Sequence, residues 1–169
     1  MKPDASEYPA YYAKYIDALG EGSLGTVLSS QLKSITALSS VTDELAMYRY
    51  AEGKWSIKEV LGHLIDCERV FTYRAMCIAR GEQQPLPGFD ENAYVANASF
   101  DSQPLSHLTE DLLSVRHATI TLHRSLTPEQ LLRSGRANGN PITVRALLWI
   151  IAGHTDHHLR ILAERYGDR

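Results

Sequence analysis

Residues 146–162 read ALLWIIAGHTDHHLRIL, an apolar run that turns polar where three histidines enter. Helical residues advance by ~100° each, so Leu147, Ile151, His154, His158 and Leu162 fall on one stripe. His154 and His158 are one helical turn apart on that apolar face. The stretch therefore predicts a buried helix that presents two imidazoles to the core.

Three further segments carry the same helical periodicity, and no alternation of strands and helices is found. They span about residues 24–38, 56–81 and 105–125, and the last helix is expected over about 144–166. Ser56 and Glu59 form a capping box before the second of them. The pattern predicts an all-α fold, an antiparallel four-helix bundle with short accessory helices, in one domain of residues 1–169.

The segments between these helices are expected to be loops and short helices. A tyrosine-rich stretch, with Tyr8, Tyr11, Tyr12 and Tyr15, is expected to pack over the bundle as a short helix or arm. Residues 82–103 form a long loop, and a loop of this length is usually functional or carries its own short helix, here residues 91–98. A helix beginning at Pro128 and a loop at residues 135–141 complete the chain.

Composition and charge exclude several classes of function. The net charge is −3 and no basic cluster occurs, so no nucleic-acid partner is expected. No apolar run approaches the length of a membrane span, and the N-terminus lacks the apolar core of a signal peptide. Cys67 and Cys77 are too far apart on one helix to form a disulfide, which favours a reducing, cytoplasmic location.

Two histidines at i and i+4 on an apolar helix face have the spacing of a metal chelate. His63 is the best third ligand, because it lies inside the apolar arc of the second long helix. Three protein ligands leave a position open for water or substrate, as in catalytic sites. We expect one divalent ion on His63, His154 and His158, zinc or nickel first, with iron or manganese as alternatives. The competing interpretation is that these are core histidines satisfied by hydrogen bonds.

The remaining histidines are assigned to structural or solvated positions. His157 is at the edge of the apolar stripe, and His107, His117 and His123 fall outside the inner stripe of their helix.

Glu68 and Arg74 are the further candidates for the site. Glu68 falls on the apolar stripe of the second long helix. It is either a base or orienter of a metal ligand, or one half of a buried ion pair with Arg49, Arg74 or Arg116. Arg74 projects on the same side as His63 and is suited to binding an anionic group. Three aromatic residues are candidates either for a pocket mouth or for core filling: Trp55, Phe89 and Tyr94.

Three stretches together resemble the DinB-like superfamily, and within it the YfiT-like metal-dependent hydrolases. They are KWSIKEVLGHLIDCERVF (54–71), ARGEQQPLPGFDENAYV (79–95) and ANGNPITVRALLWIIAGHTDHHLRIL (137–162). The resemblance implies a four-helix bundle with a histidine triad and an open metal position. The histidine of the family's second helix falls on His63, and its H-x-x-x-H pair falls on His154 and His158.

The resemblance also implies functions that the residues alone do not separate. One is a metal-dependent enzyme that hydrolyses a small molecule. Another transfers a low-molecular-weight thiol to an electrophile, and a homodimer is common among such relatives. The alternative from a different class is a non-catalytic stress protein that binds or sequesters a metal or ligand.

Overall fold

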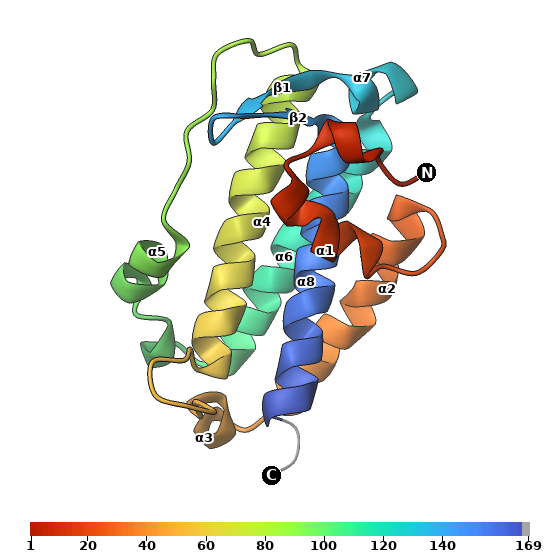
Figure 1. Ribbon diagram of the computed structural model, residues 1–169. Helices are drawn as coiled ribbons and strands as arrows, with labels where there is room; N and C mark the ends of the chain where they lie inside the picture. The colour runs from red at the N-terminus through yellow and green to blue at the C-terminus, as the bar shows by residue number, and fades with distance from the viewer. Residues whose placement is uncertain (167–169) are drawn as a thin grey trace.

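Four long helices lie side by side and form a four-helix bundle (Figure 1), as the sequence predicts. They are α2 (Leu24–Ala37), α4 (Ile57–Ala79), α6 (Leu105–Ser125) and α8 (Val144–Tyr166). The computed structural model describes residues 1–166. Gly167, the expected end of the last helix, lies outside the described residues.

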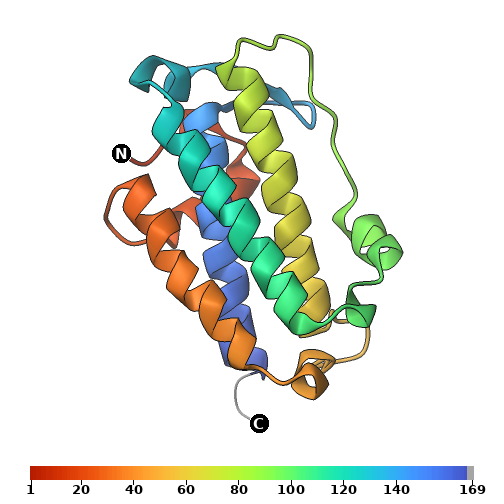
Figure 2. The ribbon, with the colours of Figure 1, turned by 180° about the vertical axis from the view of Figure 1, so that it is seen from behind.

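The helices do not alternate in direction around the bundle. α4 packs against α8 and α6, and α2 packs against α6 and α8. Figures 1 and 2 show α4 and α6 running one way and α2 and α8 the other, so the pairs α4–α8 and α2–α6 are antiparallel. The neighbours α4 and α6 are parallel, which requires the connection at residues 80–104 to return along the whole bundle.

The predicted capping box at the start of α4 is confirmed, and two further helices begin at capping residues. Ser56 and Glu59 make both bonds of the capping box at α4. Thr143 accepts a bond from the backbone N–H of Ala146 at 3.2 Å and caps α8. Asp90 caps α5 (Glu91–Ala98). Each of these side chains accepts from a backbone N–H that has no partner within its helix.

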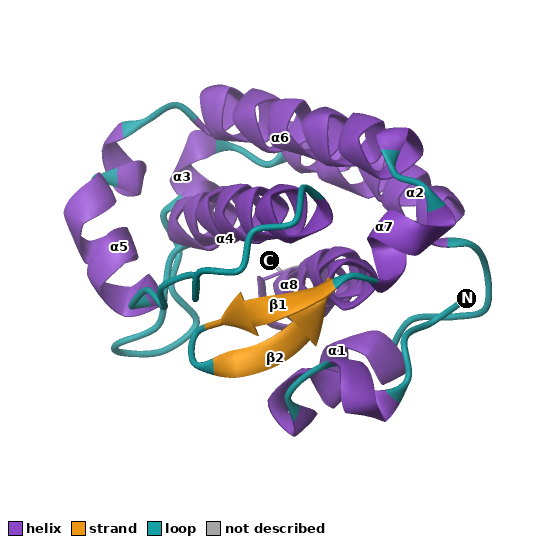
Figure 3. Ribbon diagram, turned by 90° about the horizontal axis from the view of Figure 1, so that it is seen from above, coloured by secondary structure: helices purple, strands orange, loops and turns teal. Residues whose placement is uncertain are grey.

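The expectation of a plain loop at residues 135–141 was wrong. Strands β1 (Ser134–Ala137) and β2 (Asn140–Thr143) pair there as an antiparallel hairpin. Asn138 and Gly139 turn the chain with φ of 50° and 76°, and an Asn-Gly pair is the sequence signal for this type of turn. Figure 3 shows the hairpin lying across the end of the bundle where α8 begins.

The tyrosine-rich segment forms the predicted arm over α8. It consists of two 3-10 turns, η1 (Ala5–Glu7) and η2 (Ala10–Tyr12), followed by α1 (Ala13–Asp17), and α1 lies against α8 (Figure 1). Gly153 permits this contact, because a Cβ at that position would lie 2.2 Å from the backbone oxygen of Tyr15. Glu7 accepts a bond from Arg145 Nε at 2.6 Å and fastens the arm to the start of α8.

The other short elements close the ends of the bundle. They are η3 (Leu38–Ser40), α3 (Asp43–Ala46), η4 (Phe100–Ser102) and α7 (Pro128–Leu132). None of the helices among residues 1–166 combines the length and the apolarity needed to cross a bilayer.

One buried arginine ties the four long helices together. Arg116 on α6 is fully buried and donates to both carboxylate oxygens of Glu68 on α4, at 2.8 and 2.9 Å. It also donates to Gln31 on α2 and, at 2.8 Å, to Thr155 on α8. A charge buried without such partners would cost several kcal/mol.

Candidate metal centre

Three histidine side chains converge between α4 and α8. His63 Nε2 lies 3.1 Å from His154 Nε2, and His158 Nε2 also lies 3.1 Å from His154 Nε2. The ligand nitrogens of the three residues all lie within 4.8 Å of one another. The structure thus brings together the three residues predicted as metal ligands.

Helix geometry and aromatic neighbours set this convergence. Residues four apart on α8 stack on one face, and α4 packs on that face. The Trp55 ring lies 4.7 Å from the His63 ring, and the Tyr15 ring meets His154 edge-on at 5.4 Å between ring centres. The arm and the connection before α4 therefore hold two of the three imidazoles in place.

Burial keeps the three imidazoles neutral. Removal from water lowers the pKa of His63 to about 4 and holds that of His154 well below its usual range. Burial, and then the neighbouring His63, lower the pKa of His158 to about 3. Neutral imidazole is the form of histidine that binds metals. At neutral pH none of the three rings therefore has to lose an imidazolium proton before a metal binds.

The donor set fits a divalent ion. Metal–nitrogen bonds of ~2.0–2.1 Å place nitrogens about 3.4 Å apart in a tetrahedral site and about 3 Å apart at right angles, and the observed separations of 3.1 Å lie between these values. His154 Nε2 has one lone pair or one hydrogen, so it cannot serve both neighbours well by hydrogen bonding. A cation at the common point would accept a lone pair from each nitrogen.

A cavity of about 200 Å³ opens beside His63 and His154. Along α4 it is lined at positions one turn apart by His63, Cys67, Phe71 and Arg74. The rest of its lining comes from the arm, the long connection, the hairpin turn and α8, namely Tyr11, Tyr12, Tyr15, Phe89, Glu91, Asn138 and His154.

A second hollow, of about 220 Å³, approaches the cluster from another direction. His158 lines it together with Trp55, Asn92 and Tyr166. Two hollows therefore border the cluster, with His63 and His154 lining the first and His158 lining the second.

Arg74 and the candidate aromatic residues lie around these hollows. The guanidinium of Arg74 donates to the carbonyl oxygen of Pro87 at 2.5 Å and lies 5.5 and 5.7 Å from the ring centres of Phe71 and Phe89. Tyr94 contacts Phe89 on the side of a third hollow, of about 290 Å³. Trp55 borders the second hollow and packs on His63, so it serves both the pocket and the core.

Glu68 is the buried ion-pair partner of Arg116, one of the two alternatives that its sequence position left open. Its carboxylate also accepts from Thr119 Oγ1 at 2.7 Å, and it does not line the cavity beside the histidines. His157 packs beside Tyr15 and His158. Among the described residues, the cluster holds none of His107, His117, His123 and His157.

Several residues at the cavity were not assigned to the site from the sequence, among them Cys67, Tyr15 and Glu91. Cys67, expected to be a core residue, has its sulfur 3.6 Å from His63 Nδ1, and burial raises the pKa of its thiol to about 12. Tyr15 and Glu91 come from the arm and the long connection. Cys67 was detectable as one helical turn from His63, whereas the other two depend on contacts between distant segments.

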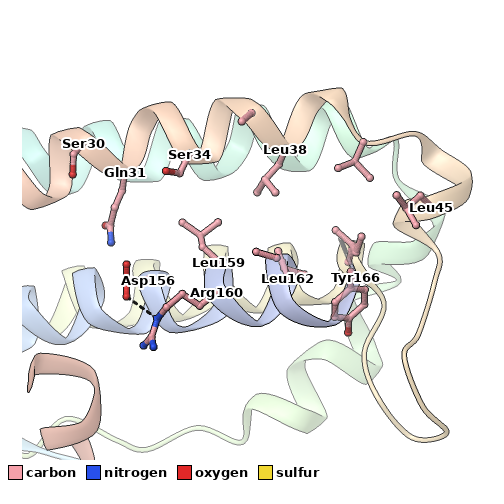
Figure 4. Close-up of a pocket in the computed structure, with 14 residues that line it drawn as sticks. Ser30, Gln31, Ser34, Leu38, Leu45, Asp156, Leu159, Arg160, Leu162 and Tyr166 are labelled. Atoms are coloured by element: carbon pink, nitrogen blue, oxygen red, sulfur yellow. Dashed lines mark hydrogen bonds and ion pairs between the residues drawn. The ribbon is translucent and has the colours of Figure 1, made fainter. Parts of the chain in front are cut away.

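A larger hollow lies elsewhere. About 750 Å³ in volume, it runs between α2 and the C-terminal half of α8 (Figure 4). Leu38, Leu159, Leu162 and Tyr166 are among its lining residues, and none of the three clustered histidines borders it. Volume alone therefore does not locate the chemistry, which lies where the polar side chains converge.

Comparison with known proteins agrees with this architecture. YfiT from Bacillus subtilis, described as a probable metal-dependent hydrolase with an unusual four-helix bundle topology, superposes with a TM-score of 0.72. The match covers 99% of this chain and 94% of YfiT at 23% identity, and it supports the fold.

A sequence relative and a family match extend the comparison. A protein of Oceanobacillus iheyensis named as a candidate metal-dependent hydrolase, OB0413, is 27% identical over 124 residues, which are 72% of this chain and 70% of that protein. The DinB superfamily matches residues 31–162, a span that contains His63, His154 and His158. With most of its length matched in this way, the chain belongs to the DinB superfamily.

Proposed function

We propose that this protein is a metal-dependent enzyme that hydrolyses an ester-like or amide-like bond in a small molecule. The observation that carries the proposal is that three neutral imidazoles meet at the end of a cavity that has room for a substrate. A divalent ion held by three protein ligands supplies Lewis acidity at its open position. The name of the Oceanobacillus relative supports hydrolysis as the reaction.

Glu91 is the residue placed to move a proton. Among the described residues that line the cavity it is the one with a carboxylate. Burial raises the pKa of Cys67 and of Tyr12, and the charge of Glu91 raises both further. We assign Glu91 as the general base that takes a proton from the attacking nucleophile.

The arm and the long connection together limit the access of water to the cavity. Tyr11, Tyr12 and Tyr15 cover one side of the cavity, and Phe89 covers another. Such walls strengthen the electrostatic interactions inside a site, since they exclude solvent.

Transfer of a low-molecular-weight thiol to an electrophile is the second candidate function. The two hollows that border the histidine cluster favour it, because a two-substrate reaction needs separate places for the thiol and the electrophile. In this version Glu91 takes the proton of the thiol.

A stress protein that only binds or sequesters a ligand has less support, since no fourth His, Cys, Asp or Glu of residues 1–166 joins the cluster.

The test compares both reactions on protein of known metal content. Purified protein is loaded with zinc, nickel, iron or manganese in turn and assayed with panels of small esters and amides. In parallel it is assayed for conjugation of monochlorobimane with bacillithiol, mycothiol or glutathione. Turnover that requires both the metal and His154 supports the enzyme, and the substrate panel decides between the reactions.

Absence of turnover in every combination, with one metal bound per chain, would favour sequestration instead.

We also propose a homodimer, which light scattering of the purified protein tests independently of activity.

A further inference from the structure

Arg74 is a buried cation for which the described residues offer no anion. Its side chain is 4% exposed, yet no carboxylate forms an ion pair with it within residues 1–166. Arg116, which is also buried, donates from Nε and Nη2 to the two carboxylate oxygens of Glu68. Buried charges are ordinarily paired as Arg116 is, because an uncompensated charge is costly to bury.

The guanidinium has unused hydrogen-bond donors beside the cavity. Of the five N–H donors of an arginine, one is given to the carbonyl oxygen of Pro87. The guanidinium lies 5.5 and 5.7 Å from the ring centres of Phe71 and Phe89, and all three residues line the cavity beside the histidines. Burial lowers the pKa of Arg74, but a guanidinium stays charged at neutral pH even so.

The surrounding backbone fixes this arrangement before any ligand arrives. Leu86 N donates to Arg136 O at 2.9 Å, and Asn138 N donates to Leu86 O at 3.0 Å. These bonds attach the long connection to the hairpin beside Pro87. A purely structural role for Arg74 as a clamp on Pro87 would use one donor and would not require a charge, so it leaves the buried cation unexplained.

The cavity joins Arg74 to the histidines. Arg74 follows His63 by three helical turns, which places the two on one face of α4 with Cα atoms ~16 Å apart along the axis. Arginine side chains on a helix lean toward its N-terminus, that is, toward His63. Cys67 and Phe71 line the cavity between them.

We infer that Arg74 binds the anionic end of the substrate, and that the enzyme acts on small carboxylates or phosphonate-like anions whose reacting group is separated from the anion by a short apolar spacer. The position of the reacting group rests on the proposed function, whereas the anion site itself does not. Glu91 lines the same cavity without forming an ion pair with Arg74, so the guanidinium is free for a ligand.

Binding of hexanoate tests the anion site, with hexanamide as a neutral probe of equal shape and hexylphosphonate as the phosphorus analogue. Binding is followed by calorimetry and by the arginine Nε–Hε signals in NMR, for metal-loaded protein and for His154→Ala. We expect hexanoate to bind at least about tenfold more tightly than hexanamide, because a carboxylate accepts charge-assisted hydrogen bonds from a guanidinium and an amide does not. Preference between hexanoate and hexylphosphonate identifies the anion.

Variants assign the effect to one residue. Arg74→Gln is expected to lose the preference for hexanoate, Arg74→Lys to keep part of it, and Arg69→Gln, on the exposed side of the same helix, to keep all of it. If the preference for hexanoate persists in His154→Ala, the anion is not bound through a metal. This result stands even if the proposed enzymatic function fails. Equal binding of hexanoate and hexanamide to the wild-type protein, or unchanged preference in Arg74→Gln, would overturn the inference. So would the absence of hexanoate binding in the millimolar range.

Discussion

At the scale of single residues, the site depends on imidazoles held neutral inside a core. His63 and His154 are 6% and 8% exposed, and both have their pKa lowered chiefly by burial. A buried imidazole that is neutral must share its lone pair with a partner. The three nitrogens meet at the junction of α4 and α8, and a cation at their common point would give each lone pair a partner.

Replacement of Glu91 tests the assignment of the base. Glu91→Gln should lower turnover about 10²–10⁴-fold, because the amide keeps the size of the side chain but cannot accept the proton. Steady-state rates on the metal-loaded variant measure the effect, with metal content determined in the same samples. Asn97→Ala, a substitution of an exposed residue on the same helix that lines neither hollow beside the histidines, provides a matched control and should keep most of the activity. A Glu91→Gln enzyme with wild-type rates would show that another group takes the proton.

At the scale of elements, the arm and the hairpin complete a site that the bundle only begins. Tyr15 of α1 packs on His154, and the hairpin holds the long connection through Leu86. Gly153 is a point of close contact between α1 and α8. The arm is thus positioned by a residue that has no side chain.

Gly153→Ala should displace α1 from α8. The added Cβ would lie 2.2 Å from the backbone oxygen of Tyr15, so the arm must move. We expect a loss of about 1–3 kcal/mol in the free energy of unfolding, as for other overpacked sites, and faster proteolysis of the arm. Urea unfolding and limited proteolysis measure the two effects, and Gly20→Ala is the control, since a Cβ at that position meets nothing within 4 Å. Equal stability of the two variants would contradict this account of the contact.

The elements also show which features a sequence discloses. Capping at Ser56 and the stripe of His154 and His158 are local patterns, with periods of three or four residues, and both were predictable. The hairpin also carried a local signal, Asn138-Gly139, which the short, polar strands obscured. Contacts of Glu91 and Tyr15 with the cavity join segments dozens of residues apart, and no local pattern encodes them.

At the scale of the whole molecule, Arg116 and its partners link α2, α4, α6 and α8 in one buried network. The network adjoins the histidine cluster through Thr155, the residue after His154. It fixes the relative positions of the helices that carry the ligands. A polar network of this kind specifies one arrangement of the bundle, because any slippage would leave a charge without its partner.

Arg116→Met should lower the free energy of unfolding by about 3–5 kcal/mol, since it leaves Glu68 buried without its cation. Chemical denaturation measures the loss. The double variant Arg116→Met, Glu68→Leu should recover much of it, because neither charge is then buried alone. Arg69→Met is the control, as its ion pair with Asp111 is exposed. If the single and double variants were equally stable, the network would not be the source of the stability.

Acid should destabilise the metal-free protein through the same histidines. In the unfolded chain a histidine has a pKa near ~6.5, whereas folding lowers that of His63 to about 4 and that of His158 to about 3. Below pH ~6.5 the unfolded state therefore binds more protons, so stability is full above this pH and is lost as the pH falls toward about 3. The slope is at most ~1.4 kcal/mol per pH unit for each histidine.

Urea unfolding of metal-free protein across this pH window checks the slope, and His158→Gln should show a shallower one. Identical slopes for the wild-type and variant proteins would mean that His158 is not held neutral by the fold.

The most direct test of the metal centre is the metal content of purified chains after equilibrium dialysis against zinc or nickel, measured by elemental analysis. The wild-type protein and His157→Ala should each retain one ion per chain and melt at a higher temperature with metal than without it. His63→Ala, His154→Ala and His158→Ala should each lose both the ion and the shift in melting temperature. Full retention of the ion by any of these three variants, or no retention by the wild-type protein, would contradict the assignment of the three histidines as a metal site.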